Sequence, residues 1–376
     1  MPELFEKTWI GSIELANRAV RSATWTGLGD ERGYVTDRAV EWYRDLARGG
    51  VGLIVTGYQY IMRNGMQLPF MIGNYEDDQI EGLSHLAAAV HEEGSKIVPQ
   101  IVHCGFRANA KLMPKGEEIW APSALPGVAH GETPHEVSKQ EIQQLIEAYA
   151  AAAVRSRKAG FDGVQLHGAH GYSINQFLSP AWNKRGDTYG GSSKNRYRFL
   201  GETMEALKVA VGDDFPILIK LSGHDFVEGG LTPEDTIEIG RRLSDDGIAA
   251  IEVSGGCEGS GDKLGPVRRK IKHEEDEAYF ADLSAAMKAA VQVPVITVGG
   301  VRSLKVIADL LTGAKADYVA MSRPFIREPH LIARWQAGDT SKATCISCNG
   351  CFETALAGSG ISCKVDRKHK EKEKKS

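Results

Sequence analysis

Residues 163–191 read GVQLHGAHGYSINQFLSPAWNKRGDTYGG, and this stretch carries the strongest indication of the fold. Residues 163–166 predict a short buried strand, which Gly168 and Gly171 open into a loop. His167, His170 and Tyr172 stand at this junction of strand and loop. In α/β barrels the catalytic side chains come from the carboxyl ends of the parallel strands. The stretch therefore predicts a barrel with a chemically active end.

Seven further segments have the short, nearly continuous apolar character of strands that are buried on both faces. Amphipathic helical patterns separate them, and Ser138 and Thr232 begin two of these helices with capping patterns. Eight alternating units predict an α/β fold of the (β/α)8 TIM-barrel type. A doubly wound sheet is disfavoured because no Gly-x-Gly-x-x-Gly joins a strand to a helix. The eight predicted strands are 19–22, 52–56, 96–102, 163–166, 217–221, 250–253, 294–298 and 317–321.

Composition narrows the class of protein further. The chain has 376 residues, 42% of them hydrophobic, and a net charge of -4, so it carries no overall attraction to nucleic acid or to an anionic membrane. It has no apolar stretch of membrane-spanning length, and its charged N-terminus, MPELFEKTWIGSIEL, does not resemble a secretory signal. We therefore expect a cytoplasmic protein with six reduced cysteines, either monomeric or a homo-oligomer.

The chain divides into a barrel over residues 1–338, a cysteine-rich segment over 339–363 and a charged tail over 364–376. The tail, KVDRKHKEKEKKS, is a dense run of charge and is expected to be solvated or disordered. Two connections, 103–135 and 168–195, are too long for simple turns. Both begin at the carboxyl end of a predicted strand, where the catalytic side chains of a barrel lie. Both are candidate lids, and we expect residues 111–133 to select the substrate.

His167, His170 and Tyr172 suit a particular kind of chemistry. Two imidazoles can hold a carbonyl or phenolate oxygen, and a phenol beside them can supply a proton. A zinc site on the two histidines is disfavoured, because they lie in a glycine-rich loop without an obvious carboxylate partner.

Four cysteines gather near the C-terminus. Cys345, Cys348 and Cys351 are each separated by two residues, and Cys363 follows after eleven more. Thiolates in this number and spacing suit either an iron–sulfur cluster or zinc, and the remaining alternative is that they bind no metal.

Residues 167–200, HGAHGYSINQFLSPAWNKRGDTYGGSSKNRYRFL, resemble the Old Yellow Enzyme family of FMN-dependent oxidoreductases, and the similarity extends over about residues 4–329. The resemblance implies that reduced FMN adds hydride to an activated C=C bond. His167 and His170 would hold the carbonyl oxygen of the substrate, and Tyr172 would protonate the α-carbon. NAD(P)H or a separate electron-donor protein would reduce the flavin.

The resemblance also assigns the contacts to the flavin. Trp25 stands where relatives have Thr, Cys or His, and Lys220 stands where they usually have Arg, beside flavin N1 and O2. Lys keeps the charge but lacks the planar fork of Arg. The implied contacts to the ring system are Ala23, Thr24, Trp25, Gly57, Tyr58, Gln100, His167 and Lys220, and those to the phosphate are Gly299, Gly300, Ser322 and Arg323.

The segment Thr26-Gly27-Leu28 and the four cysteines resemble the branch of 2,4-dienoyl-CoA reductase and trimethylamine dehydrogenase. That branch holds a [4Fe–4S] cluster after the barrel and continues into a flavin and nucleotide domain. The resemblance thus implies an ene-reductase that acts on an enone, enal or dienoyl compound. The alternatives are a flavin and iron–sulfur subunit of a larger electron-transfer complex and a non-redox barrel that binds a phosphate ligand.

Overall fold

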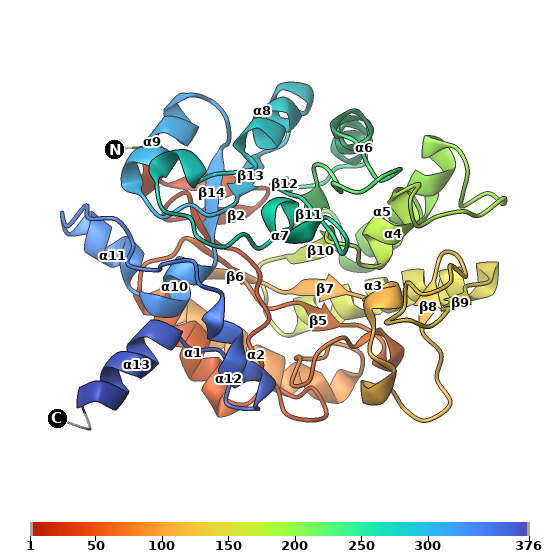
Figure 1. Cartoon of the computed structure of the whole chain (residues 1–376), viewed down its shortest axis with the longest axis horizontal. Coiled ribbons are helices and arrows are strands. Elements are labelled where there is room, and N and C mark those ends of the chain that lie inside the picture. The colour runs from red at the N-terminus through yellow and green to blue at the C-terminus, as the bar shows by residue number, and fades with distance from the viewer. Residues whose placement is uncertain (1–2, 374–376) are drawn as a thin grey trace.

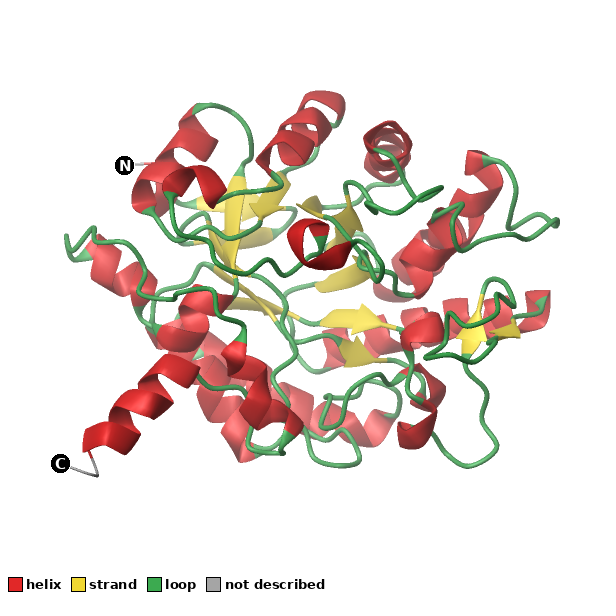
Figure 2. Ribbon diagram, viewed as in Figure 1, coloured by secondary structure: helices red, strands yellow, loops and turns green. Residues whose placement is uncertain are grey.

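A ring of parallel strands surrounded by helices forms the centre of the molecule (Figures 1 and 2). The computed structural model describes residues 3–373. All eight predicted strands are present, which confirms the (β/α)8 barrel. They are β3 (Ala19–Arg21), β4 (Leu53–Val55), β6 (Lys96–Val98) with β7 (Gln100–Val102), β10 (Val164–Gly168), β11 (Ile217–Ser222), β12 (Ala250–Ser254), β13 (Val295–Val298) and β14 (Tyr318–Met321).

The third strand of the barrel is divided in two by Pro99. Proline has no N–H to donate to a sheet, so the segment predicted as one strand over 96–102 becomes β6 and β7. β6 pairs with β4, and β7 pairs with β10 and with the short β5 (Gln59–Tyr60). Since only Pro99 separates β6 from β7, this strand joins the two ends of the sheet and closes the ring.

Helices cover the outside of the ring, and their ends follow the capping chemistry in the sequence. Ser138 and Thr232 accept hydrogen bonds from the third residue of α3 and α6, and both capping boxes are complete. The helices after successive strands are α1 (Asp37–Arg48), α2 (Ile80–His91), α3 (Lys139–Lys158), α5 (Ser193–Val211), α6 (Pro233–Asp245), α8 (Ala281–Ala290), α9 (Leu304–Thr312) and α10 (Arg323–Arg327) with α11 (Leu331–Gln336).

A hairpin of β1 (Thr8–Ile10) and β2 (Ile13–Leu15) fills one end of the barrel interior. Ile10, Ile13 and Leu15 are buried in one cluster with inward residues of the ring, such as Leu53 and Leu218. The functional residues of the sequence follow strands at the opposite, carboxyl end. The hairpin therefore seals the base of the barrel and leaves the carboxyl end for a ligand.

The two long connections contain short elements of their own. The first includes β8 (Trp120–Ala121), which pairs with β9 (His135–Glu136), and the second includes α4 (Ser173–Leu178). A further short helix, α7 (Gly261–Leu264), follows β12. No helix within residues 3–373 is both long and apolar enough to cross a membrane.

The C-terminal segment packs against the barrel, and part of it differs from the expectation. The sequence predicted a solvated or disordered tail from residue 364, whereas residues up to 373 form helix α13 (Lys364–Glu373), after the short α12 (Glu353–Leu356). Asp366 pairs with Arg327 of α10 at 3.1 Å, and Arg367 pairs with Glu353 at 3.2 Å. Lys- and Glu-rich sequence favours helix, and these ion pairs fix its first turn. Residues 374–376 of the predicted tail lie outside the described part.

Candidate active site

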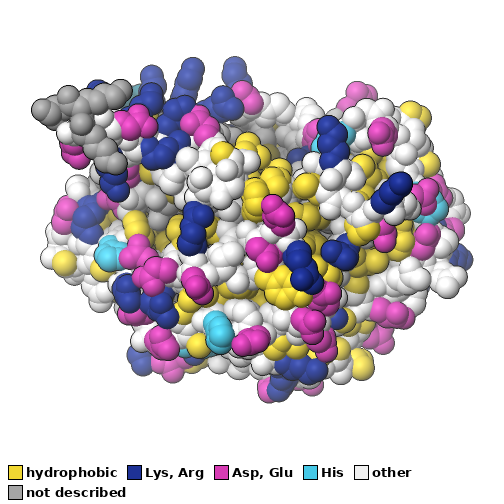
Figure 3. Space-filling model, turned by 90° about the horizontal axis from the view of Figure 1, so that it is seen from below, with side chains coloured by type: hydrophobic (Ala, Val, Ile, Leu, Met, Phe, Trp, Pro, Cys, Tyr) yellow, Lys and Arg dark blue, Asp and Glu magenta, His cyan; other side chains and the backbone are white. Residues whose placement is uncertain are grey.

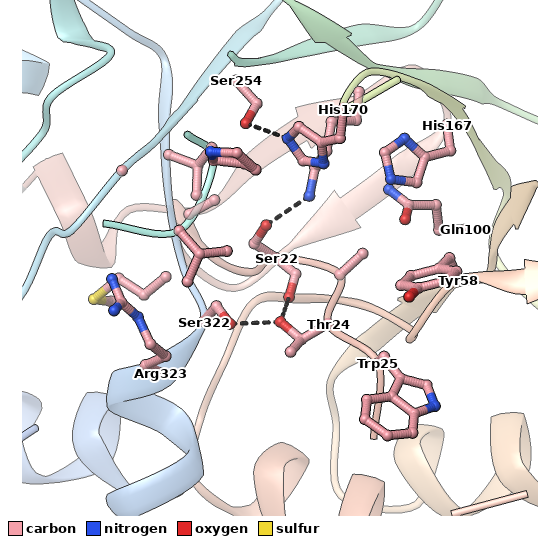
Figure 4. A pocket seen from close by; sticks show the side chains of 18 of the residues that line it. Ser22, Thr24, Trp25, Tyr58, Gln100, His167, His170, Ser254, Ser322 and Arg323 are labelled. Carbon is pink, nitrogen blue, oxygen red and sulfur yellow. Dashed lines mark hydrogen bonds between the residues drawn. The ribbon is translucent and has the colours of Figure 1, made fainter. Parts of the chain in front are cut away.

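A cavity of about 590 Å³ opens at the carboxyl end of the barrel. Its volume falls within the 300–1,000 Å³ that is typical of cofactor and ligand sites. All the predicted flavin and catalytic residues line it except Gly57, whose N–H instead donates to the Tyr43 hydroxyl at 2.7 Å. Figure 4 shows His167, Gln100 and Tyr58 in a column along one wall, with Arg323 on the opposite side. Residues from seven separate strands or strand ends thus meet at one site.

His167, His170 and Tyr172 form a compact cluster in this cavity. The ring centroids of His167 and Tyr172 are 4.5 Å apart, and those of His167 and His170 are 5.1 Å apart. His170 has a positive φ of 62°, which turns its ring toward Ser254, and its Nε2 lies 2.7 Å from the Ser254 hydroxyl. A left-handed backbone at a non-glycine residue is uncommon and costs free energy, so the position of His170 is imposed by its surroundings.

The electrostatics of the cluster keep all three groups uncharged near neutral pH. Burial lowers the pKa of His167 and of His170 well below the usual value, and the cations Lys220 and Arg107 lower the pKa of both further. Burial raises the pKa of the Tyr172 phenol. Neutral imidazoles still carry one N–H each, and a neutral phenol keeps its proton. The cluster can therefore donate hydrogen bonds to an oxygen and deliver one proton.

Two residues that the sequence did not single out for this role hold Tyr172 in place. The Tyr172 hydroxyl donates to the Gln67 side-chain oxygen at 2.7 Å, and the Tyr58 hydroxyl donates to the same oxygen at 3.1 Å. The Arg107 guanidinium lies 5.4 Å from the Tyr172 ring centroid and pairs with Glu258 at 2.7 Å. Arg107 lies five residues after the end of β7. Its position after a barrel strand was the one feature of the sequence that could have indicated a place in the active site.

Buried neutral histidines make stability depend on pH. Burial also lowers the pKa of His103 to about 3, so His103, His167 and His170 bind fewer protons when folded than when unfolded. Below the unfolded pKa of about 6.5 the unfolded chain takes up these protons, and each histidine lowers the free energy of unfolding by about 1.4 kcal/mol per pH unit. We expect urea denaturation to show stability falling from pH 6.5 to pH 5. A free energy of unfolding that stays constant over this range would contradict the assignment.

A chain of buried polar groups runs beneath the cavity. The strand register sets Gln165 beside Gln100 and sets Lys220 beside Glu252. Gln100 Nε2 donates to Gln165 at 2.7 Å, and Gln165 Nε2 donates to Glu252 at 3.0 Å. Lys220 pairs with Glu252 at 3.2 Å and donates to the Ser22 hydroxyl at 2.8 Å, while that hydroxyl donates to Glu252 at 2.6 Å.

Within this series of hydrogen-bonded groups, the sequence did not predict a functional role for Glu252. Its side chain is 0% exposed, and it is the carboxylate that balances the charge of Lys220. The sequence showed only a Glu within an apolar strand, and the pairing of that strand with β11 was needed to reveal its partner. Burial lowers the pKa of Lys220, whereas Glu252 raises it.

Gln100 has a feature that fits the pyrimidine edge of a flavin. Its amide nitrogen is engaged by Gln165, but its Oε1 is buried without a hydrogen-bond partner. An unsatisfied buried acceptor is costly unless a ligand donor reaches it, and an imide N–H is such a donor. The residues present therefore fit FMN at this wall.

Replacing Gln100 by Leu tests this fit. Loss of one buried hydrogen bond costs about 1–3 kcal/mol, which corresponds to about 5–150-fold weaker FMN binding. Flavin fluorescence titration of the apoprotein measures the affinity, and thermal unfolding checks that the variant is folded. An unchanged FMN affinity in a folded variant would remove Gln100 from the pyrimidine edge.

The opposite side of the cavity offers a place for a phosphate. Gly299 and Gly300 have positive φ, and a Cβ on either would lie within 3.0 Å of the Tyr279 ring. Arg323 lines the cavity and donates to the Arg268 carbonyl at 2.7 Å. Arg302 was not predicted, yet it also lines the cavity. Its Nε and Nη2 are buried without a hydrogen-bond partner, and Nε lies 4.0 Å from the Glu277 carboxylate. Guanidinium N–H groups that lack a hydrogen-bond acceptor suit an anionic oxygen.

Trp25 links the cavity to the C-terminal segment. Its ring stacks on Phe352, with centroids 6.3 Å apart and planes 11° apart, and its Nε1 donates to the Pro69 carbonyl at 3.2 Å. Its N–H is therefore engaged away from the cavity, and its ring forms part of the wall.

The four C-terminal cysteines line one small internal cavity, together with Arg323 and Arg327. Cys348 is exposed and Cys351 is buried, and burial raises the pKa of Cys351 to about 11, with a further contribution from Cys345. Within residues 3–373, no group of three or more His, Cys, Asp and Glu residues is placed to hold a metal ion. The predicted metal ligands are thus gathered without being in metal-binding geometry.

Known proteins are similar to this chain over most of its length. The NADH oxidase of Thermoanaerobacter brockii is 37% identical over 93% of this chain and 54% of its own length. The NADPH dehydrogenase of Clostridium acetobutylicum is 36% identical over 88% of this chain and 93% of its own length. A structure of 2-naphthoyl-CoA reductase with 2-naphthoyl-CoA has a TM-score of 0.89 and 28% identity, covering 97% of this chain and 57% of that one.

The chain spans about half the length of the T. brockii enzyme and nearly the full length of the C. acetobutylicum enzyme. The resemblance to the Old Yellow Enzyme family is confirmed. Since residues 3–341 match the family as a whole, the chain belongs to the NADH:flavin oxidoreductase / NADH oxidase family.

Proposed function

We propose that this chain binds FMN in the barrel cavity and uses electrons from NAD(P)H to reduce the activated C=C bond of an enone, enal or dienoyl compound. One observation carries the proposal. A buried, protonated Tyr172 lies beside a neutral His167, in the same cavity as the unsatisfied Gln100 acceptor.

Each side chain has a distinct part in this reaction. FMN, when bound and reduced, supplies the hydride. His167 and His170 donate hydrogen bonds to the substrate carbonyl oxygen, where negative charge develops. Tyr172 gives its proton to the α-carbon, and the Arg107 guanidinium, 5.4 Å from the ring centroid, stabilises the phenolate that remains. Lys220 holds a positive charge beneath the cavity, balanced by Glu252.

We further propose that the four cysteines hold a [4Fe–4S] cluster. Zinc would need thiolates about 2.3 Å from one ion, and the described residues have no such grouping. The four thiols nevertheless line one cavity. The soft thiolate ligands and their C-x2-C-x2-C spacing also favour iron and sulfide.

A second candidate function is a flavin and iron–sulfur subunit of a larger electron-transfer complex. The observation that favours it is that several relatives, including the NADH oxidase, are about twice as long as the matched region. In that case electrons would reach the flavin through the cysteine segment rather than directly from NAD(P)H.

An anaerobic absorbance spectrum of the purified protein, with iron and sulfide analysis, tests these proposals together. We expect flavin bands, broad iron–sulfur absorbance, and NAD(P)H oxidation that depends on an enone such as 2-cyclohexenone. Protein that binds no flavin after FMN is added would overturn the proposed function in favour of a non-redox barrel. Fast NAD(P)H turnover without iron would remove the second candidate.

A further inference from the structure

A surface groove of about 650 Å³ lies over the cysteine segment. One wall is helix α13, and the other includes Arg269 from the connection after β12. Exposed Cys348 and half-exposed Ile346 line the groove between them. The groove also includes Asn349, Gly350, Glu353, Lys364, Val365, Lys368, His369 and Lys372.

The groove is strongly cationic. Lys364, Lys368 and Lys372 are spaced by four residues and so share one face of α13. Arg269 adds a charge from the opposite wall, and Lys270 and Lys272 are exposed beside it. Glu353 is the one carboxylate among the described lining residues, and Lys364 and Arg367 already pair with it. Figure 3 shows several Lys and Arg side chains projecting from one edge of the molecule, with Asp and Glu side chains among them.

The two walls are joined through the active site. Arg323 donates to the Arg268 carbonyl at 2.7 Å and also hydrogen-bonds Asn349. Lys270 N–H donates to the Ser347 carbonyl at 3.3 Å. The basic connection and the cysteine segment are therefore held together, and the cations of the two walls stay on the same side of the molecule.

The groove, the cysteine cavity and the barrel cavity are neighbours that share lining residues. Cys348 lines both the groove and the internal cysteine cavity, and Arg323 lines both the cysteine cavity and the barrel cavity. A carrier seated in the groove would touch the exposed Cys348, which also lines the cysteine cavity.

From this arrangement we infer that the groove is the docking site for the acidic face of a one-electron carrier protein. The inference rests on the proposed FMN and cysteine-held cluster. A cationic groove attracts an acidic surface and raises its association rate. Each carrier gives up one electron per encounter. Two encounters supply the two electrons for one C=C bond, and the two protons come from solvent, one of them through Tyr172.

Stopped-flow reduction by an acidic [2Fe–2S] ferredoxin tests the inference on the full chain loaded with FMN and iron. The variant K368E/K372E reverses two groove charges, and K139E/K158E makes the same change in net charge at exposed lysines at the two ends of α3. At low salt we expect the groove variant to lower the second-order rate at least tenfold and the control variant to lower it less than twofold. The difference should vanish near 0.5 M salt, where screening is short-ranged. Reduction by dithionite, which needs no docking, should be equal in all three proteins.

Two results would overturn the inference, and only one of them would also contradict the proposed cluster on the four cysteines. If the FMN- and iron-loaded variants are reduced by ferredoxin at equal rates, the docking site alone is overturned. If a short DNA duplex then binds and only K368E/K372E abolishes that binding, the groove is assigned to nucleic acid. A chain that holds no iron and sulfide overturns both the docking site and the cysteine part of the proposed function.

Discussion

Replacing Tyr172 by Phe is expected to slow reduction of 2-cyclohexenone by reduced enzyme about 10²–10⁴-fold, the usual contribution of a positioned general acid. Reduction of the flavin by NAD(P)H should change by less than about threefold, since no proton from Tyr172 enters that step. The phenol is suited to the role because burial raises its pKa and keeps it protonated, and because its ring lies 4.5 Å from that of His167. Stopped-flow measurement of the two half-reactions separates the effects.

Tyr58→Phe is the matched control for this experiment. The Tyr58 hydroxyl donates to the same Gln67 oxygen, and its ring centroid lies 5.5 Å from that of Tyr172 but 6.0 Å from that of His167. The control therefore removes an equivalent hydroxyl without removing the acid, and we expect a loss below about tenfold. Equal losses in both half-reactions of Tyr172→Phe would show that Tyr172 shapes the cavity rather than delivering the proton.

Replacing Glu252 by Leu is expected to lower the free energy of unfolding by about 3–5 kcal/mol, the range found when one member of a buried ion pair is removed. Lys220 is 4% exposed and would be left with the Ser22 hydroxyl and no carboxylate. Gln165 and Ser22 would also each lose an acceptor. Denaturant unfolding of the apoprotein measures the change, so that FMN binding does not contribute.

The double variant Lys220→Met/Glu252→Leu distinguishes loss of the ion pair from loss of packing. If the cost comes from an uncompensated buried cation, the double variant should recover more than half of the lost stability, because two apolar side chains replace the pair. A double variant as unstable as Glu252→Leu would mean that the hydrogen bonds to Ser22 and Gln165, rather than the charge of Lys220, make Glu252 necessary.

Much of the fold could be predicted because local signals agreed with each other. The eight strands are nearly continuous apolar runs, and the caps at Ser138 and Thr232 mark where α3 and α6 begin. Two features were missed for opposite reasons. The prediction of one strand over 96–102 did not take into account that Pro99 has no N–H. The prediction of a solvated or disordered tail did not take into account that Asp366 and Arg367 anchor α13. The local Lys- and Glu-rich sequence already favoured a helix there, but the ion pairs that anchor it to Arg327 and Glu353 form only through tertiary packing.

The sequence by itself determined the barrel, the family and the gathering of His167, His170 and Tyr172, because residues within six positions at a strand end must lie near one another. Only the tertiary structure decided what surrounds them. Gln67, Arg107 and Glu252 come from three other parts of the chain, and the closure of the ring brings them to the same site. The tertiary structure also placed Cys348 in the lining of a basic groove that brings together Arg269 and Lys364, which are 95 positions apart. Distances between remote segments depend on how strands pair and loops cross, and no local pattern records them.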